Sequence, residues 1–532
     1  MHSHTIEILI GLLIAATVLA WLANRLRVPY PILLTLGGLA IGFTPWERLF
    51  GAPVEVSLRP ELVFLLFLPP LLYYAGMMTT WRDFVGNLRP ILLLAVGLVL
   101  ATTCAVAAVA HYYMGFGWAA AFALGAIVSP PDAIAATAIT TRLRIPKRIV
   151  TILEGESLVN DATALVAYRL ALFAAGGTFF LSSAAVGFAW NVVGGVAVGA
   201  LAGAIVMWVR ARLRDPIIEG AIAILAPFIA YLPAEWIGSS GVLAAVTAGI
   251  YVSRNVSRKL SARSRLRDIA VWDALVFMMN GFIFILMGLQ LPAILRSLSQ
   301  YSNAQLTTYA LVISLVAIVV RILWVFPATY VPRWVSRSLA RRDPAPPWQQ
   351  TTIVAWAGMR GIVSLAAALA LPNGEGGTTP FPHRDLIIFI TFCVILATLV
   401  CQGLSLPLLI RSFGFQEEDA DSQEELTARH ATAVAVLERL ATIAAERSAP
   451  PELVERVRLN YDDRVRHLVA RLIDDLPPSD VPAYDTARRL HRELLQVERR
   501  ALVLLRDQNM IGDEVMRKVE LDLDLEEFKL NA

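Results

Sequence analysis

The chain has 532 residues, of which 57% are hydrophobic and 17% are charged, and its mean hydropathy is +0.60. This composition is too apolar for a soluble protein of this length and indicates a membrane protein with many spans. The net charge of +3 says little by itself. Cys104, Cys393 and Cys401 lie in apolar stretches without metal-ligand or redox spacing, so we expect them to be packing residues.

Apolar segments recur along the first four fifths of the chain. They lie at about 6–24, 29–43, 61–77, 90–113, 117–141, 148–174, 184–209, 216–233, 237–253, 269–291, 306–331, 349–371 and 385–411. Segments of this length cross a bilayer as helices, because a membrane barrel shows short alternating strands instead. The first segment lacks a basic leader region and a clear cleavage site, so we expect a retained span rather than a signal peptide. The sequence predicts an all-α polytopic membrane protein with about 13 transmembrane helices.

Basic residues occupy every second loop between these segments. The basic loops contain Arg25 and Arg27; Arg82 and Arg89; Arg142, Arg144, Lys147 and Arg148; Arg210, Arg212 and Arg214; Arg254, Arg258, Lys259, Arg263, Arg265 and Arg267; and Arg333, Arg337, Arg341 and Arg342. Cytoplasmic loops carry the excess of Lys and Arg. We therefore expect a multi-pass protein of the cell inner (plasma) membrane, with the N-terminus outside and the C-terminus cytoplasmic.

The composition becomes charged and helix-forming after the last apolar segment. Helical patterns at about 422–447, 450–474 and 483–508 are separated by proline pairs. We expect a transmembrane domain at 1–412 and a cytoplasmic helical domain at 413–532. This tail contains no glycine-rich nucleotide loop, and both an assembly role and a ligand-sensing role are compatible with its sequence.

The fifth segment contains Ser129-Pro130-Pro131-Asp132 near its centre. Two consecutive prolines remove two backbone donors, so we expect the helix to be broken there. Irregular backbone at this depth is tolerated where it lines a cavity or is buried in protein. The freed carbonyls from Val128 to Pro131 are then candidate oxygen ligands beside the Asp132 carboxylate. A simple proline kink is the alternative.

The sixth segment places Asp161 at its middle, where a carboxylate is expensive and by default marks a substrate or proton pathway. Ser157 and Asp161 are four residues apart and share one helix face, which Asn160 borders. Glu154 lies on the same face, either as an attractor of cations or as a solvated helix end. Glu156 lies about 140° around the helix from Asp161 and should therefore need a partner of its own.

The twelfth segment carries Arg360 between Gly358 and Gly361. A buried arginine must be paired, and Glu156 is the carboxylate that the helix geometry leaves over. We expect a structural Glu156–Arg360 ion pair, with a transport role for Arg360 as the alternative. Arg321, in the eleventh segment, competes for the same glutamate.

Carboxylate, hydroxyl, amide and backbone oxygens suit a hard cation. We expect Asp161, Asp132, Ser157 and Asn160 to bind it, with Asp161 and Asp132 also carrying the proton. Competition of Na⁺ and H⁺ for one carboxylate, combined with alternating access, is sufficient for antiport. A cation channel and a K⁺/H⁺ antiporter are the alternatives. A hydrolase using Ser157 is disfavoured because all seven histidines lie at ends, in loops or in the tail, and we expect no enzyme activity, no cofactor and no nucleic-acid partner.

At these residues the chain resembles the monovalent cation:proton antiporter family, in the branch that includes the animal sodium/proton exchangers. The resemblance covers about 1–412. It rests on Gly155-Glu156-Ser157-Leu158-Val159-Asn160-Asp161, on Pro131-Asp132-Ala133 and on Gly358-Met359-Arg360-Gly361. It implies an inverted repeat of six plus six helices, broken helices five and twelve that cross at the site, a homodimer and an elevator-like movement.

The same resemblance implies electroneutral exchange, because Asn160 rather than an aspartate precedes Asp161. It also implies a part in pH homeostasis. One departure matters, since many members carry a glutamate where this chain has Tyr73-Tyr74-Ala75-Gly76. No role of that glutamate carries over to this chain.

Overall fold

A computed structural model of the protein describes most of the chain. It covers residues 2–26, 28–44, 60, 63–132, 136–137, 145–175, 181–213, 215–373, 379–415, 420–446 and 450–472, with short pieces beyond 493. The chain divides into two compact units, Met1–Glu417 and Glu418–Ala532. All regular structure in the described residues is helical, which confirms the predicted all-α class.

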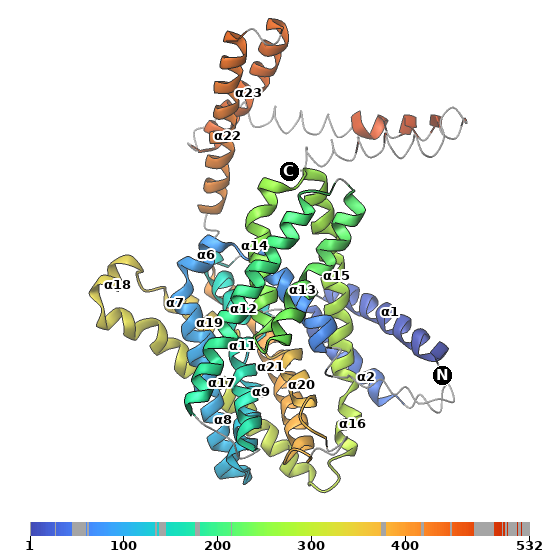
Figure 1. The fold of residues 1–532 in the computed structure, drawn as a ribbon, viewed down its shortest axis with the longest axis vertical. Coiled ribbons are helices and arrows are strands. Elements are labelled where there is room, and N and C mark those ends of the chain that lie inside the picture. The colour runs from blue at the N-terminus through green and yellow to red at the C-terminus, as the bar shows by residue number, and fades with distance from the viewer. Residues whose placement is uncertain are drawn as a thin grey trace. The chain divides into compact units, whose positions relative to one another are not determined.

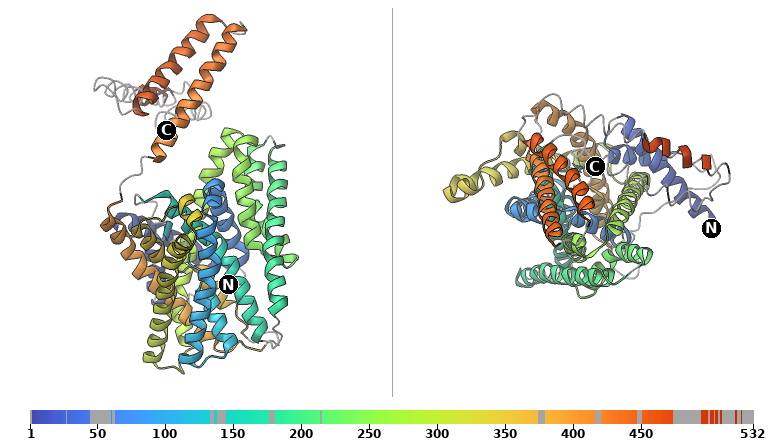
Figure 2. Two further views of the ribbon diagram at one scale, coloured as in Figure 1. Left: turned by 90° about the vertical axis from the view of Figure 1, so that its left-hand side faces the viewer. Right: turned by 90° about the horizontal axis from the view of Figure 1, so that it is seen from above.

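The first unit is a bundle in which most helices run roughly along one direction (Figure 1), and Figure 2 shows it from the side and from above. Its elements are α1 (His2–Leu26), α2 (Tyr30–Phe43), the π-helix η1 (Val63–Phe67), α5 (Leu68–Met78), α6 (Trp81–Gly86), α7 (Leu88–Leu92), the π-helix η2 (Leu93–Leu98), α8 (Val99–Met114), α9 (Trp118–Val128), α11 (Lys147–Ala175), α12 (Leu181–Arg210), α13 (Pro216–Trp236), α14 (Gly241–Lys259), α15 (Ala262–Leu289), α16 (Leu291–Arg296), α17 (Asn303–Val335), α18 (Arg337–Arg342), α19 (Trp348–Trp356), α20 (Ile362–Leu369) and α21 (Arg384–Phe413).

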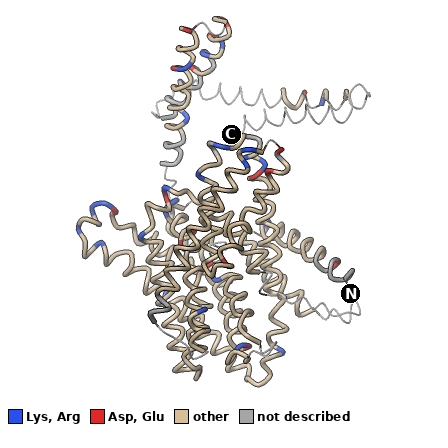
Figure 3. Tube along the Cα trace, in the orientation of Figure 1, with Lys and Arg blue, Asp and Glu red and all other residues tan. Residues whose placement is uncertain are grey.

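Seven stretches of the described chain are long and apolar enough to cross a membrane. They are Leu88–Met114, Lys147–Ala175, Val186–Arg210, Ile217–Trp236, Ser264–Arg296, Asn303–Val335 and Arg384–Phe413. Shorter apolar helices cover Ile10–Leu26, Tyr30–Phe43, Val63–Met78 and Trp118–Val128. Figure 3 shows that charged residues gather mainly at the helix ends, with few along their middles. The number of 13 crossings and the inverted repeat stay predictions.

Two helices are interrupted inside the bundle. Helix α9 ends at Val128 and is followed by the non-helical residues 129–132, as the two prolines predict. Helix α19 ends at Trp356, and α20 begins only at Ile362. The two breaks meet, because the Asp132 amide donates a hydrogen bond of 2.7 Å to the Met359 carbonyl. The predicted interruptions of helices five and twelve are confirmed, and their crossing stays a prediction.

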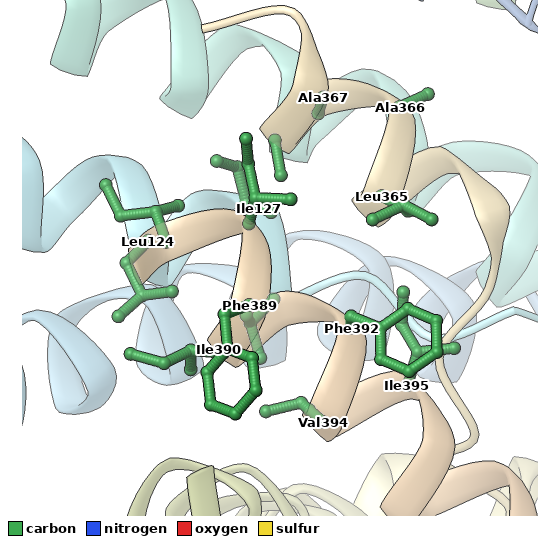
Figure 4. Close-up of a cluster of buried hydrophobic side chains, with 14 of the residues drawn as sticks. Leu124, Ile127, Leu365, Ala366, Ala367, Phe389, Ile390, Phe392, Val394 and Ile395 are labelled. Carbon is green, nitrogen blue, oxygen red and sulfur yellow. The ribbon is translucent and has the colours of Figure 1, made fainter. Parts of the chain in front are cut away.

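The half-helices α9 and α20 are fixed by apolar packing against α21. Figure 4 shows this cluster, to which Leu124 and Ile127 of α9, Leu365 of α20, and Phe389 and Ile390 of α21 all belong. The fully buried members touch no water, so displacing a half-helix would expose apolar surface or open cavities. This packing holds the irregular backbone of the two breaks in one place.

In the second unit, α22 (Ala420–Ala445) and α23 (Pro451–Leu472) pack against each other. Both helices begin and end within a few residues of the predicted boundaries 422–447 and 450–474. Ala433 of α22 and Val454 of α23 are buried. The third predicted helix, 483–508, lies largely outside the described residues.

Candidate functional site

A cavity of about 430 Å³ lies inside the first unit where the two breaks meet α11. Asp132, Ser157 and Asp161 all line it, and Asp161 is only 7% exposed. Three of the four residues that we expected at a cation site therefore share one cavity. Its other walls come from α2, α5, α15 and α20.

Helix α11 presents its polar side chains to this cavity as its helical spacing requires. Ser157 and Asp161 are one turn apart, and Glu154 lies two turns before Asp161. All three line the cavity. Glu154 is half-buried there, so the expectation of a carboxylate on the same face as Asp161 matches the geometry.

Asn160 is fully buried but does not line the cavity. Its side-chain amide donates a hydrogen bond of 2.8 Å to the carbonyl of Pro131. That carbonyl belongs to the break after α9, where regular helical bonding has stopped. Asn160 therefore stabilises the broken backbone beside Asp132, and its expected part as a cation ligand stays a prediction.

The expected Glu156–Arg360 ion pair is wrong. Glu156 instead pairs with Arg321 of α17 in a two-pronged arrangement, with Nη1–Oε1 at 2.6 Å and Nη2–Oε2 at 2.9 Å. Both side chains are 1% exposed. The helix geometry correctly identified Glu156 as the carboxylate turned away from Asp161, but the spacing along one helix does not fix which arginine of another helix reaches it.

Both buried arginines, Arg321 and Arg360, donate hydrogen bonds to backbone carbonyls at or near the C-terminal ends of the half-helices. Arg321 donates from Nε and Nη2 to the Val354 carbonyl near the end of α19, at 3.2 and 3.0 Å. Arg360 donates from Nε to the carbonyl of Val128, the last residue of α9, at 2.7 Å. It also donates from Nη1 to the carbonyl of Gly358, two residues earlier in the chain. The carbonyls at a helix C-terminus lack helical partners and carry partial negative charge, so guanidinium groups are well suited to them.

This arrangement also changes the expected role of the freed backbone carbonyls. We expected those from Val128 to Pro131 to be available to a cation, but Val128 binds Arg360 and Pro131 binds Asn160. Side chains therefore bind two of the four carbonyls that we expected to be free, those of Val128 and Pro131.

The carboxylate of Asp132 packs directly against Gly361, immediately before α20. A Cβ atom added to Gly361 would collide with the Asp132 carboxylate oxygen, so this position has room only for glycine. The start of a helix carries partial positive charge, which favours an anion at that place. Asp132 is thus held between its own broken helix and the start of α20.

Sequence reasoning missed five polar residues of the cavity, namely Tyr30, Tyr74, Thr137, Asn280 and Ser364. Asn280 of α15 and Ser364 of α20 line it and are 4% and 2% exposed. Tyr74 of α5 also lines it and donates from its hydroxyl to Oδ1 of Asp273 at 2.5 Å. The signal available in the sequence was weak, namely a single Asn or Ser inside an otherwise apolar segment.

The cavity thus combines three carboxylates and several neutral oxygens with apolar walls from α5 and α15. Such a set binds a hard cation or protons, and a buried carboxylate takes up a proton more readily than one in water. With Glu156 neutralised by Arg321, the carboxylates that line the cavity are Asp132, Glu154 and Asp161.

Comparison with known proteins agrees with the family resemblance seen in the sequence motifs. The family model described as "Sodium/hydrogen exchanger, transmembrane" matches residues 12–412. An uncharacterized Na(+)/H(+) exchanger of Mycobacterium tuberculosis is 37% identical over 527 residues, which cover 98% of this chain and 96% of that protein. A sodium, potassium, lithium and rubidium/H(+) antiporter of Bacillus pumilus is 36% identical over 418 residues, 76% of this chain and 61% of that protein.

Among solved structures, the sodium proton antiporter MjNhaP1 of Methanocaldococcus jannaschii is similar to this chain. The match has a TM-score of 0.62 at 19% sequence identity and covers 78% of this chain and 99% of that one. At this identity the likeness shows a shared fold.

Proposed function

The chain belongs to the sodium/hydrogen exchanger family, and from that premise we propose that it is a secondary active transporter exchanging a monovalent cation, in the first place Na⁺, for H⁺. One observation carries the proposal. Asp132 and Asp161, contributed by different helices, share a single cavity in the interior of a helical membrane unit. Carboxylates at that depth are expensive and mark an ion or proton pathway.

We propose Asp161 as the carrier of both ions. Its carboxylate holds either a cation, with Ser157 and Asp132 as further oxygen ligands, or a proton, but not both at once. Binding of one therefore expels the other. Exchange follows if the loaded site opens to each side in turn and the empty charged site does not cross.

The charge count around the site favours electroneutral exchange. Glu156 is neutralised by Arg321, and the residue before Asp161 is the neutral Asn160, bound to backbone. If one carboxylate carries one Na⁺ or one H⁺, equal charge moves in the two directions.

We further propose how the unit moves and where it lies. The cavity separates α2, α5 and α15 from the crossed breaks and α11, so sliding of the second group against the first changes access to the site. The alternation of basic loops supports an inner-membrane protein with an external N-terminus and the domain at 413–532 in the cytoplasm. Homodimer formation follows from the family resemblance.

Broader cation selectivity is the second candidate. The Bacillus pumilus relative is named for four alkali cations, and neutral oxygens beside carboxylates also accept K⁺ and Li⁺. K⁺/H⁺ exchange by the same site is therefore tested together with Na⁺/H⁺ exchange.

The test uses the purified full-length chain in liposomes with an acidic interior and a pH-sensitive dye. External Na⁺, Li⁺ or K⁺, with choline as the control ion, should dissipate the gradient in a saturable way. Clamping the membrane potential should leave the rate unchanged if exchange is electroneutral. Cation flux without coupled proton movement would indicate a channel and would overturn the proposal.

A further inference from the structure

Two buried oxygen atoms, on residues that line the cavity, lack a hydrogen-bond partner among the described residues. They are Oδ1 of Asn280 and Oγ of Ser364. Their side chains are 4% and 2% exposed and line the same cavity as Asp132 and Asp161. A buried polar atom without a partner is costly and rare, so each such atom requires an explanation.

The two residues come from neighbouring helices on a wall apart from α11. Asn280 lies on α15 and Ser364 on α20, and these helices pack against each other. An amide carbonyl and a hydroxyl are both oxygen ligands for a hard cation. Neither takes up a proton near neutral pH, so this pair distinguishes a cation from a proton, whereas the aspartates accept both.

We propose that Asn280 and Ser364 form a neutral oxygen subsite that binds the dehydrated cation on its way to Asp161. The inference rests on the proposed function and adds a binding step to it. Neutral ligands hold a monovalent cation weakly, as a transit position requires, because an ion must enter such a site and also leave it.

One face of α15 supplies a path to this subsite. Asp273 precedes Asn280 by seven residues, which is two turns or about 10 Å along the same helix face. Val276, between them, lines the cavity. Asp273 is exposed and accepts a hydrogen bond from Tyr74, another cavity residue. The face thus runs from an exposed carboxylate, about three turns inside α15, to the buried amide.

The test compares Asn280→Leu and Ser364→Ala with the unaltered full-length chain in liposomes, using Na⁺, Li⁺ and K⁺ as probes. Each variant should raise the apparent KM for the cation by roughly threefold to tenfold, the effect of losing one neutral ligand. The maximal rate should stay close to that of the unaltered chain, because Asp161 still carries both ions. Met279→Leu, on the same helix turn but outside the cavity lining, is the matched control and should leave KM unchanged.

Well-folded Asn280→Leu and Ser364→Ala proteins with unaltered KM values for all three cations would overturn the inference. The two oxygens would then bind water and not the transported cation. If Asn280→Leu does not fold, Asn280→Ser shortens the side chain and carries the same expectation. An unaltered chain that shows no cation-driven proton movement would defeat the proposed function itself. The two failures are therefore distinguishable.

Discussion

Removing one partner of the Glu156–Arg321 pair should destabilise the protein more than removing both. The pair is 1% exposed on each side and has two charge-assisted hydrogen bonds of 2.6 and 2.9 Å. Arg321→Met or Glu156→Met leaves one buried charge uncompensated, which costs about 3–5 kcal/mol. The double variant leaves no isolated charge. Its loss should be about 1–2 kcal/mol, because the Val354 carbonyl loses its bonds from Arg321.

The measurement is the apparent midpoint of thermal unfolding in detergent. The expected order, from most to least stable, is the unaltered chain, the double variant and the two single variants. Arg169→Met is the matched control, since the Arg169–Glu235 pair, at 3.0 Å, has side chains that are 42% and 30% exposed. Such a pair contributes at most about 1 kcal/mol. A double variant that loses the sum of the two single losses would refute the pairing.

Four further outcomes are expected, the first two read as cation-driven pH change in liposomes. Gly361→Ala should lower exchange by roughly a hundredfold, because its Cβ displaces the Asp132 carboxylate; an unaffected rate would show that the contact does not matter. Asp132→Asn should also impair exchange severely, since it keeps the shape but removes the charge. Asn160→Ala should cost about 1 kcal/mol of stability in detergent by freeing the Pro131 carbonyl, and an unaltered midpoint would contradict this. A chain ending at Glu417, the boundary of the first unit, should still exchange ions; loss of exchange in a well-inserted truncated protein would contradict that.

Local chemistry made the break of the fifth helix predictable from the sequence. Pro130 and Pro131 cannot donate backbone hydrogen bonds, so the end of α9 near them follows from the residues themselves. The shared face of Ser157 and Asp161 follows equally directly from the helical period, and both line the cavity.

Contacts between helices distant in the sequence were not predictable in the same way. The choice between Arg321 and Arg360 as partner of Glu156 depends on how α17 and the second break pack against α11. In the break, residues 357–361 are non-helical, so the direction of the Arg360 side chain does not follow from a helix pattern. Its guanidinium reaches the end of α9 instead.

The polar cavity residues of α15 and α20 were missed for a related reason. A single Asn280 within an apolar segment has several ordinary explanations, and only the fold shows that its side chain lines the same cavity as Asp161. The sequence alone showed that this chain has Tyr73-Tyr74 where many family members carry a glutamate. That Tyr74 instead binds Asp273 of α15 required the structure.

The most direct test of the central claim is exchange by Asp161→Asn in liposomes. The substitution keeps the shape of the side chain but removes the negative charge and the proton-binding oxygen. With membrane insertion and monodispersity verified, the variant should show no cation-driven pH change for Na⁺, Li⁺ or K⁺, while the unaltered chain does. Robust exchange by Asp161→Asn would contradict the claim and would mean that cation and proton meet at another residue.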